Sequence, residues 1–152
     1  MYDINQEVIS GFQKEYRFLS NFVPAKVIYD DVEYFSVEVA FQAAKTLNIA
    51  DRLPFQHCTS AQAKRLGRQL TLQGNWHNLQ ISVMYKLVLQ KFSQPHFKKL
   101  LLATNKSLLV EENYWNDRFW GVCKGVGRNY LGRILMLVRH ELITGKFEPK
   151  LL

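Results

Sequence analysis

The chain has 152 residues, of which 47% are hydrophobic, and a formal net charge of +7 from 20 Lys and Arg against 13 Asp and Glu. A domain of this length can bury roughly 68 to 70% of the surface that its unfolded chain exposes, so it can build a core without staples. Its longest apolar run is too short for a membrane span of about 20 residues, and its two Cys and four His show no metal-ligand spacing. These features exclude a membrane-spanning helix, a disulfide framework and a zinc site.

The opening residues, MYDINQEV, lack the basic and apolar regions of a signal peptide. Together with the two isolated cysteines, this predicts a reducing, cytoplasmic setting. Between Asp51 and Glu111 there is no acidic residue but nine Lys and Arg, which form a cationic block. Such a block attracts anions and points to a phosphate-bearing metabolite or nucleic acid, with a merely solvated basic surface as the alternative.

The first predicted elements are strands. Residues 8–12 (VISGF) read as one strand, and residues 25–35 (AKVIYDDVEYF) read as a hairpin that turns at Asp30–Asp31, because Asp favours such turns.

The rest of the chain is predicted to be mostly helical. Capping residues and apolar periodicity give, in chain order, a helix from Val37 capped by Ser36, a helix to about Leu70 with a Thr59–Gln62 capping box, a helix capped by Asn75 to about Phe92, a helix from Pro95 to Leu102, a strand over 108–112, and a helix from Asn129 to about Ile143. The expected fold class is α+β, predominantly α-helical with a small β-sheet. We expect a single domain over residues 1–152.

The segment SVEVAFQAAK, residues 36–45, combines an apolar helix with a narrow polar seam. At 3.6 residues per turn, Glu38, Gln42 and Lys45 line up along that seam, beside a stripe of apolar side chains. The seam is either a strip that faces solvent or one wall of a polar site.

A second dense segment runs over residues 116–139, where three glycines precede the last helix. Free N–H groups at a helix start favour an anion, but the spacing fits neither a Walker loop nor a dinucleotide-binding G-x-G-x-x-G motif. What remains is a glycine-rich loop with two alternatives: a ligand site, or a structural loop in which the glycines allow a backbone conformation that other residues disfavour. It carries Asp117, Trp120, Lys124, Arg128 and Asn129.

Seven short motifs occur in order between about residues 11 and 142: FLSNF (18–22), SVEVAFQAAK (36–45), RLGR (65–68), W-x7-M-x7-F (76–92), LLLATNKSLLVE (100–111), D-x-F-W-G (117–121) and G-x-G-x-N-x-L-G-x-x-L-M-x-x-R (125–139). This set resembles the NADAR family, also called YbiA-like. Three positions depart from the family pattern. Val39 stands where the family commonly has His, Cys123 where Gly is frequent, and Gln80 where Lys is frequent.

The resemblance implies a hydrolase of N-glycosyl bonds that needs no cofactor and no metal. Known members act on phosphorylated intermediates of riboflavin biosynthesis or on ADP-ribose attached to guanine in nucleic acid. The expected partner is therefore a phosphorylated ribosyl small molecule or ADP-ribosylated nucleic acid, with no membrane. Two alternatives stay open: a glycohydrolase that removes ADP-ribose from guanine in DNA or RNA, and a non-catalytic module that binds ADP-ribose-like ligands.

Glu38 is the predicted catalytic carboxylate. Cleavage of a ribosyl C1–N bond passes through an oxocarbenium-like transition state, which a fixed, ionised carboxylate near C1 stabilises. The same carboxylate can instead orient the attacking water, and both roles stay open.

The other candidate residues come from the motifs of the resemblance and from their chemistry. Each has a structural alternative, such as a turn for Asp117, a helix cap for Asn129, core packing for Trp76, and a solvated face for the arginines of residues 65–68. The further catalytic candidates are Asp117 and Trp120, and the substrate-binding candidates are Ser20, Asn21, Phe22, Gln42, Lys45, Arg65, Gly67, Arg68, Trp76, Arg128 and Asn129.

Overall fold

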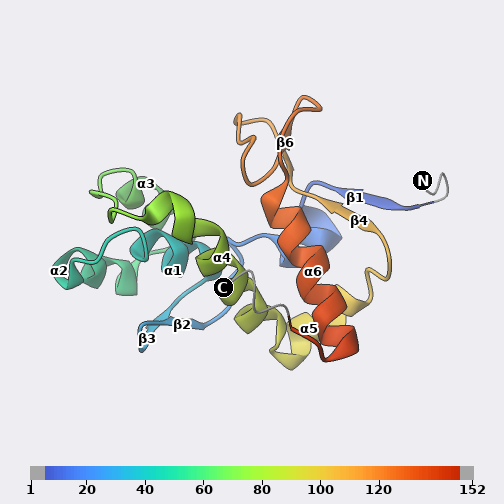
Figure 1. Ribbon diagram of the computed structural model, residues 1–152, viewed down its shortest axis with the longest axis horizontal. Helices are drawn as coiled ribbons and strands as arrows, with labels where there is room; N and C mark the ends of the chain where they lie inside the picture. Colours follow the sequence, from blue (N-terminus) through green and yellow to red (C-terminus); the bar gives the residue numbers. More distant parts are fainter. Residues whose placement is uncertain (1–5, 148–152) are drawn as a thin grey trace. The chain divides into compact units, whose positions relative to one another are not determined.

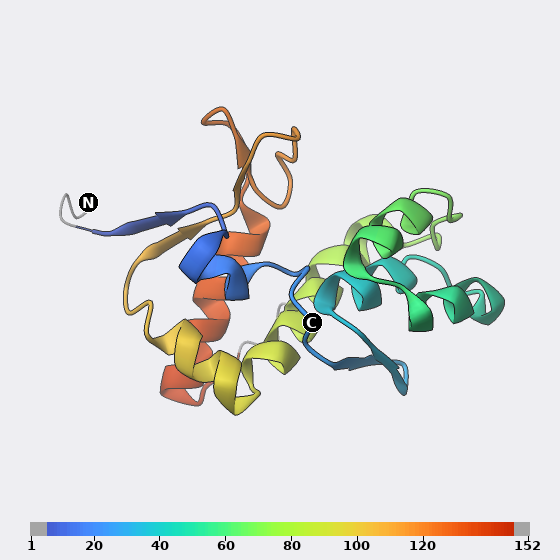
Figure 2. The same cartoon turned by 180° about the vertical axis from the view of Figure 1, so that it is seen from behind.

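The computed structural model describes residues 6–147, which divide into two compact units (Figures 1 and 2). Unit 1 comprises residues 6–20 and 92–147, and unit 2 comprises residues 21–91. Each unit is described by itself below. The expectation of a single domain over 1–152 stays a prediction.

Unit 2 begins with the predicted hairpin, in which β2 (Val27–Tyr29) pairs antiparallel with β3 (Val32–Tyr34). Asp30 and Asp31 form the two-residue turn, with φ angles of 48° and 64°. Positive φ at both central residues is the mark of a type I′ turn, whose twist matches that of the strands. The predicted hairpin and its turn are confirmed.

Helix α1 (Val37–Ala43) is buried along its whole length. Ser36 caps it as predicted, since its hydroxyl accepts a hydrogen bond from the Val39 N–H at 3.2 Å. Its main partner is α3 (Ser60–Gly67), which starts with the predicted capping box between Thr59 and Gln62. Since no face of α1 is open, its polar seam does not face solvent.

Helix α3 ends at Gly67, so the predicted end near Leu70 is wrong. The chain turns after Gly67 because it folds back over the end of α1, where the Gln73 N–H donates to the Lys45 carbonyl at 2.7 Å. Two short helices that the sequence analysis missed, α2 (Ile49–Arg52) and η2 (Leu53–His57), fill the preceding segment.

Helix α4 (Trp76–Phe92) has the predicted length. Asn75 precedes it, but its side-chain oxygen accepts from the Asn78 side-chain amide at 2.8 Å. The core positions expected on this helix are buried, with exposed fractions of 2% or less: Met84, Leu87, Val88 and Phe92.

Unit 1 is built on a parallel strand pair, β1 (Val8–Ser10) with β4 (Leu108–Val110). Helix α6 (Tyr130–Thr144) packs on β4. Helix α5 (Pro95–Leu102), which has the predicted bounds, packs against α6, and η1 (Lys14–Leu19) packs against α5.

The predicted strand over 108–112 is interrupted at Glu111. The Glu111 N–H is bound by the Asn129 side chain and its carbonyl by the Val122 N–H, which divides the segment between two pairings. β5 (Glu112–Asn113) then pairs parallel with β6 (Val122–Cys123). The described residues thus hold three two-stranded sheets, in keeping with an α+β class rich in helix.

Within residues 6–147, none of the helices is both long and apolar enough to cross a membrane. Both cysteines are free thiols, with Cys123 buried and Cys58 half-buried. In the same residues no group of three or more His, Cys, Asp or Glu side chains is arranged to hold a metal ion.

Candidate functional site

Glu38 lies in the first turn of α1 and is only 9% exposed. Its backbone N–H donates to the Asn21 carbonyl at 3.1 Å, so the preceding loop holds the start of the helix. Its side-chain Oε1 accepts a hydrogen bond from Gln42 Nε2 at 2.9 Å. Acidic side chains are seldom buried unless they are paired, so the position of Glu38 is unusual. The interpretation of Glu38 as a solvent-facing acid is wrong.

Gln42 is 6% exposed and lies against Gly67 at the end of α3. A Cβ atom added to Gly67 would come within 1.9 Å of Gln42 Oε1, so no larger residue fits without moving the amide. In the part of the chain that the structure describes, Gln42 Oε1 has no hydrogen-bond partner. The structure therefore shows Gly67 as a packing partner of Gln42, while its predicted contact with substrate stays a prediction.

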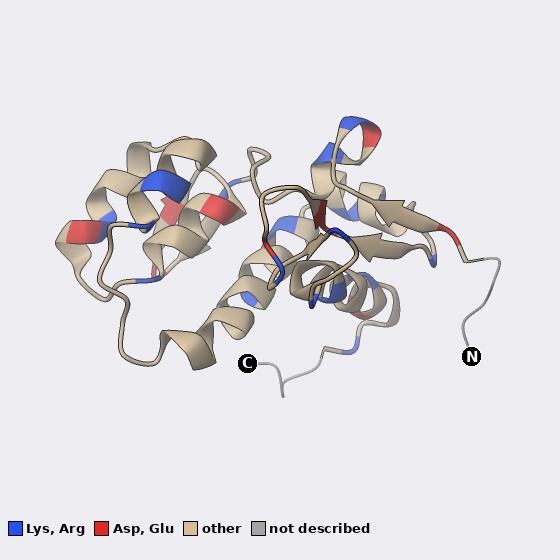
Figure 3. Cartoon of the chain, turned by 90° about the horizontal axis from the view of Figure 1, so that it is seen from above, with Lys and Arg blue, Asp and Glu red and all other residues tan. Residues whose placement is uncertain are grey.

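Lys45 belongs to the seam and interacts electrostatically with two further basic side chains, Lys64 and Arg68; these three residues are here named the cation cluster. Burial lowers the pKa of Lys45 because it disfavours the charged ammonium; nearby Glu38 raises that pKa, and Arg68 and Lys64 lower it further. Screening limits such effects to short distances, so the three cations and one carboxylate share a small region. Basic residues also occur elsewhere in both units (Figure 3), and Arg65 is exposed on α3.

Residues 20–22 form the loop before the hairpin. The Ser60 hydroxyl donates to the Phe22 carbonyl at 2.8 Å, and the Lys64 ammonium lies 5.7 Å from the centre of the Phe22 ring. Asn21 is buried and its side-chain amide points at the sulfur of Met84, 3.4 Å away. Ser20 ends the first of the two segments of unit 1, and its N–H donates to the Arg17 carbonyl at the end of η1.

Trp76 is buried at the start of α4, with 4% of its surface exposed. Its ring packs at 5.2 Å from that of Phe41 on α1. These contacts match the core-packing alternative for Trp76, and its stacking on a ligand stays a prediction.

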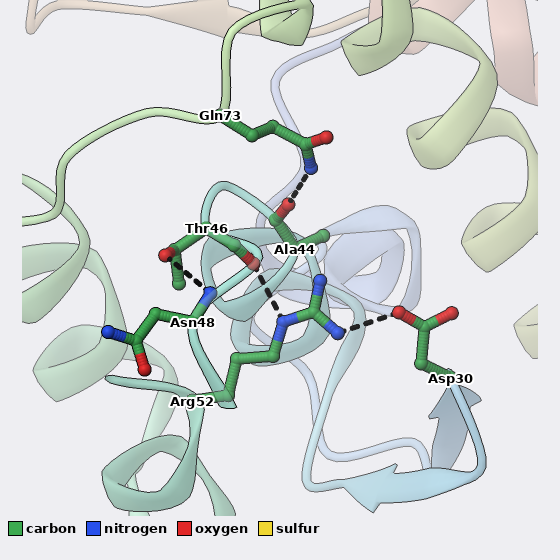
Figure 4. Close-up of polar contacts among 6 residues, drawn as sticks. All are labelled: Asp30, Ala44, Thr46, Asn48, Arg52 and Gln73. Carbon is green, nitrogen blue, oxygen red and sulfur yellow. Dashed lines mark hydrogen bonds and ion pairs between the residues drawn. The ribbon is translucent and has the colours of Figure 1, made fainter. Parts of the chain in front are cut away.

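Arg52 is a buried cation that the sequence analysis did not select (Figure 4). Its Nε donates to the Thr46 carbonyl at 2.8 Å, and its Nη1 forms an ion pair with Asp30 at 2.6 Å. Arg52 thereby joins the hairpin turn to the segment after α1. Figure 4 also shows the Gln73 side chain donating to the Ala44 carbonyl at 2.8 Å. In the sequence, the one feature that pointed to Arg52 was its place in the cationic block. Its contacts could not be predicted, because Asp30 and Thr46 are brought to it by the fold.

In unit 1, Asp117 shapes the loop that carries Trp120. Its Oδ1 accepts hydrogen bonds from the backbone N–H groups of Phe119 at 3.1 Å and Trp120 at 2.9 Å, so the turn expected as the alternative for Asp117 is present. The half-buried Trp120 ring packs edge-on against Phe119, with 4.8 Å between the centroids. The turn fixes the direction of the Trp120 side chain.

Asn129 ties the glycine-rich loop to β4. Its Oδ1 accepts from the Glu111 N–H and its Nδ2 donates to the Leu109 carbonyl, both at 2.9 Å, so the side chain mimics a neighbouring strand. Asn129 occupies the N-cap position of α6, where its carbonyl accepts from the Arg133 N–H, but its side chain makes no capping hydrogen bond because the amide is already engaged. The adjacent Arg128 is exposed. Contacts of Asn129 and Arg128 with substrate stay predictions.

Unit 1 also contains a pocket of about 510 Å³ that follows the carboxyl ends of β1 and β4. The Ser10 hydroxyl donates to the Glu112 carboxylate at its wall. None of the site residues proposed from the sequence lines it; its lining is Ser10, Gly11, Gln13, Lys14, Glu15, Tyr16, Glu112, Asn113 and Tyr114.

A family model for the NADAR domain matches residues 6–143. The chain belongs to the NADAR family. The match includes nearly all described residues of both units, so the Glu38 seam and the Asp117 loop both lie inside the NADAR domain.

Curated relatives carry two kinds of name. The chain is 35% identical over 146 residues to N-glycosidase Npun_R5314 of Nostoc punctiforme, covering 88% of this chain and 93% of the relative. It is 34% identical to N-glycosidase YbiA of Escherichia coli (strain K12), covering 94% of each. It is also 37% identical to riboflavin biosynthesis protein VVA0006 of Vibrio vulnificus, but covers only 35% of that longer protein.

Among solved structures, the NMR structure of the Escherichia coli protein YbiA superimposes with a TM-score of 0.83 at 32% identity. The match covers 97% of this chain and 91% of that one. The predicted α+β fold of the YbiA-like type is thereby confirmed.

Proposed function

We propose that this NADAR protein is an N-glycosidase that hydrolyses the ribosyl C1–N bond of a phosphorylated N-riboside. The observation that carries the proposal is the buried Glu38 carboxylate with the cation cluster around it. The names of the relatives from Nostoc and Escherichia coli, both N-glycosidases covered almost end to end, support the reaction class.

Glu38 has the properties that the transition state demands. As the C1–N bond stretches, positive charge develops on the ribose, and a carboxylate held nearby stabilises it. Burial strengthens this attraction because little water screens it. Glu38 is held in place at its backbone by Asn21 and at its side chain by Gln42. Orientation of the attacking water is a second task open to the same carboxylate.

The cation cluster suits the phosphate of the substrate. Lys45, Lys64 and Arg68 bring three positive charges to the region of one carboxylate, and the lowered pKa of Lys45 reflects partly their mutual repulsion. A bound phosphate would relieve that repulsion, so the region favours an anionic ligand.

The Asp117 loop remains part of the proposal. We infer that Trp120 stacks on the base or ribose of a ligand, supported by its only partly buried ring and by the turn that fixes it. Asp117 is the second candidate for the catalytic carboxylate. The reducing, cytoplasmic setting expected from the sequence is kept here, supported by the two free thiols.

Two substrate classes satisfy this chemistry. A riboflavin-pathway intermediate is favoured by the riboflavin biosynthesis proteins among the relatives. ADP-ribose on guanine in DNA or RNA is the second candidate, and the acid-free segment between Asp51 and Glu111 suits either class because both are anionic. A module that binds ADP-ribose without cleaving it is the alternative from a different functional class.

Incubation of the pure protein with phosphorylated riboflavin-pathway intermediates and with ADP-ribosylated oligonucleotide tests these candidates. Release of ribose phosphate or of free ADP-ribose identifies the substrate. Binding of a polynucleotide should weaken by orders of magnitude between low and moderate salt, whereas a metabolite with one or two phosphates should show a shallow dependence. Tight ADP-ribose binding without turnover of either substrate would support the non-catalytic module and contradict the enzyme.

A further inference from the structure

We propose that Gln42 and Gly67 are positioning residues for Glu38. The Gln42 amide orients the Glu38 carboxylate by a hydrogen bond, and the absence of a side chain at Gly67 provides the space that the amide occupies. The inference rests on the proposed function, in which Glu38 faces the charge that develops at C1.

The orientation of the Gln42 amide is the first observation. Its Nε2 donates to Glu38 Oε1 at 2.9 Å, while its own Oε1 is buried and has no hydrogen-bond partner among residues 6–147. Buried amides normally satisfy both ends. The reversed amide would press its oxygen against a carboxylate oxygen, so the ionised Glu38 that the proposed function requires favours the observed orientation, and the amide in return fixes that carboxylate oxygen. An apolar side chain of the same length would fill the space without leaving an acceptor unpaired.

The identity of residue 67 is the second observation. Gly67 is the last residue of α3, and its φ angle lies outside the left-handed region that favours glycine. A helix disfavours glycine relative to alanine, so the backbone gives no reason for it. A Cβ atom there would lie 1.9 Å from Gln42 Oε1 and 2.8 Å from Cδ, but 3.3 Å from Gln42 Cβ. The requirement for glycine comes from the amide group of Gln42, since the stem of that side chain leaves nearly enough room.

A double-mutant cycle separates this role from simple packing. Gly67→Ala and Gln42→Ala should each lower kcat about tenfold or more, because the Glu38 carboxylate is no longer held in its orientation. The double variant should be no slower than Gln42→Ala alone, since the added methyl then meets no amide. KM should change less than threefold in all three, because the cation cluster is untouched.

Two further variants provide the controls. Gln42→Met keeps the length of the side chain and removes the donor, so kcat should fall as in Gln42→Ala while the melting temperature stays near that of the parent. Gly74→Ala is the matched glycine control, because no atom lies within 4 Å of a Cβ at that position. Its activity and its melting temperature should equal those of the parent.

The outcomes discriminate between the inference and the proposed function. Additive losses of kcat in the cycle, or full kcat in Gln42→Met, would overturn the positioning role. If the parent turned over neither substrate class, the proposed function would fail, and with it the catalytic part of the inference. The melting temperatures of the same variants would then still test whether a Cβ at residue 67 clashes with the Gln42 amide. Non-additive changes of the melting temperature would support the clash, and additive changes would contradict it.

Discussion

Glu38 places a carboxyl group where most side chains are apolar. All seven residues of α1 are buried, and the Glu38 side chain is held there by hydrogen bonding instead of by exposure to water. Removal of the carboxyl group should therefore affect chemistry more than folding, since burial of an ionisable group is itself unfavourable.

We expect Glu38→Gln to lower kcat by roughly 10² to 10³, the scale for removing one preorganised electrostatic stabiliser. Glutamine keeps the shape, and its oxygen can still accept from Gln42. Ligand affinity should change little, because the charge at C1 is small before the bond stretches. The measurements are kcat and ligand Kd on one sample, with circular dichroism to verify folding. Turnover within about threefold of the parent would contradict the catalytic role of Glu38 and favour Asp117 as the catalytic carboxylate.

The two arginines of the RLGR motif should differ in effect. Both are exposed, but only Arg68 acts electrostatically on Lys45 beside Glu38. Replacing Arg68 together with Lys64 by Ala should raise KM by tenfold or more with a smaller effect on kcat, if both bind phosphate equally in ground and transition states. Arg65→Ala is the matched control and should raise KM by less. Equal effects of the two replacements on KM would contradict phosphate binding by the cation cluster and support its interpretation as a solvated basic surface.

Lys45 predicts a pH dependence of substrate binding. Burial lowers its pKa from the ordinary value of 10.5, so the ammonium loses its proton at a lower pH than that value would give. KM should therefore rise on the alkaline side, beginning below that value, as the phosphate loses a cation. In Lys45→Arg the guanidinium stays charged, and the rise should disappear or move to higher pH. The exposed Lys86 provides the control: Lys86→Arg should leave the KM profile unchanged, and a profile equally unchanged in Lys45→Arg would contradict the assignment.

At the scale of elements, the hairpin shows how local sequence specifies local structure. The Asp30–Asp31 pair predicted the turn, and both residues adopt positive φ angles that only a few residue types tolerate. Asp30 also accepts the Arg52 ion pair, whereas Asp31 has no such bond among the described salt bridges.

Asp31→Gly should stabilise the protein by a few tenths to about 1 kcal/mol, because glycine adopts positive φ without strain and Asp-Gly is a preferred type I′ pair. Asp31→Val should destabilise it, since a β-branched residue resists that conformation. Urea unfolding of both variants measures the effect. A lower stability for Asp31→Gly than for the parent would show that the Asp31 side chain contributes more than its backbone costs.

Elements were predictable where their signals are local. Ser36, the Thr59–Gln62 capping box and Pro95 each mark a helix start within a few residues of sequence, and all three helices begin there. The end of α3 and the break at Glu111 were not predictable, because Gln73 and Asn129 impose them from elsewhere in the chain. The same holds for the site: periodicity placed Glu38 and Gln42 on one seam, but burial of the seam and the contact with Gly67 depend on packing of α1 against α3.

At the scale of the whole molecule, one prediction concerns metals. The sequence shows no ligand spacing, and residues 6–147 contain no group of three or more potential ligands. Turnover should survive dialysis against EDTA without loss. Activity that EDTA abolished and that zinc or magnesium restored would reveal a metal site and require a different account of how the C1–N bond is polarised.

The division of the chain also bears on the order in which the protein forms during translation. Unit 2 is one continuous stretch, whereas unit 1 joins residues 6–20 with residues 92–147, and Val8 pairs with Leu108. A ribosome adds about 5 to 20 residues per second, so β1 waits roughly 5 to 20 seconds for its partner strand to be made. During that interval the segment that forms unit 2 is synthesised, so its first elements can begin to fold before β1 has a partner. Unit 1 is therefore completed last, because β1 can pair with β4 only after the whole segment that forms unit 2 has been made.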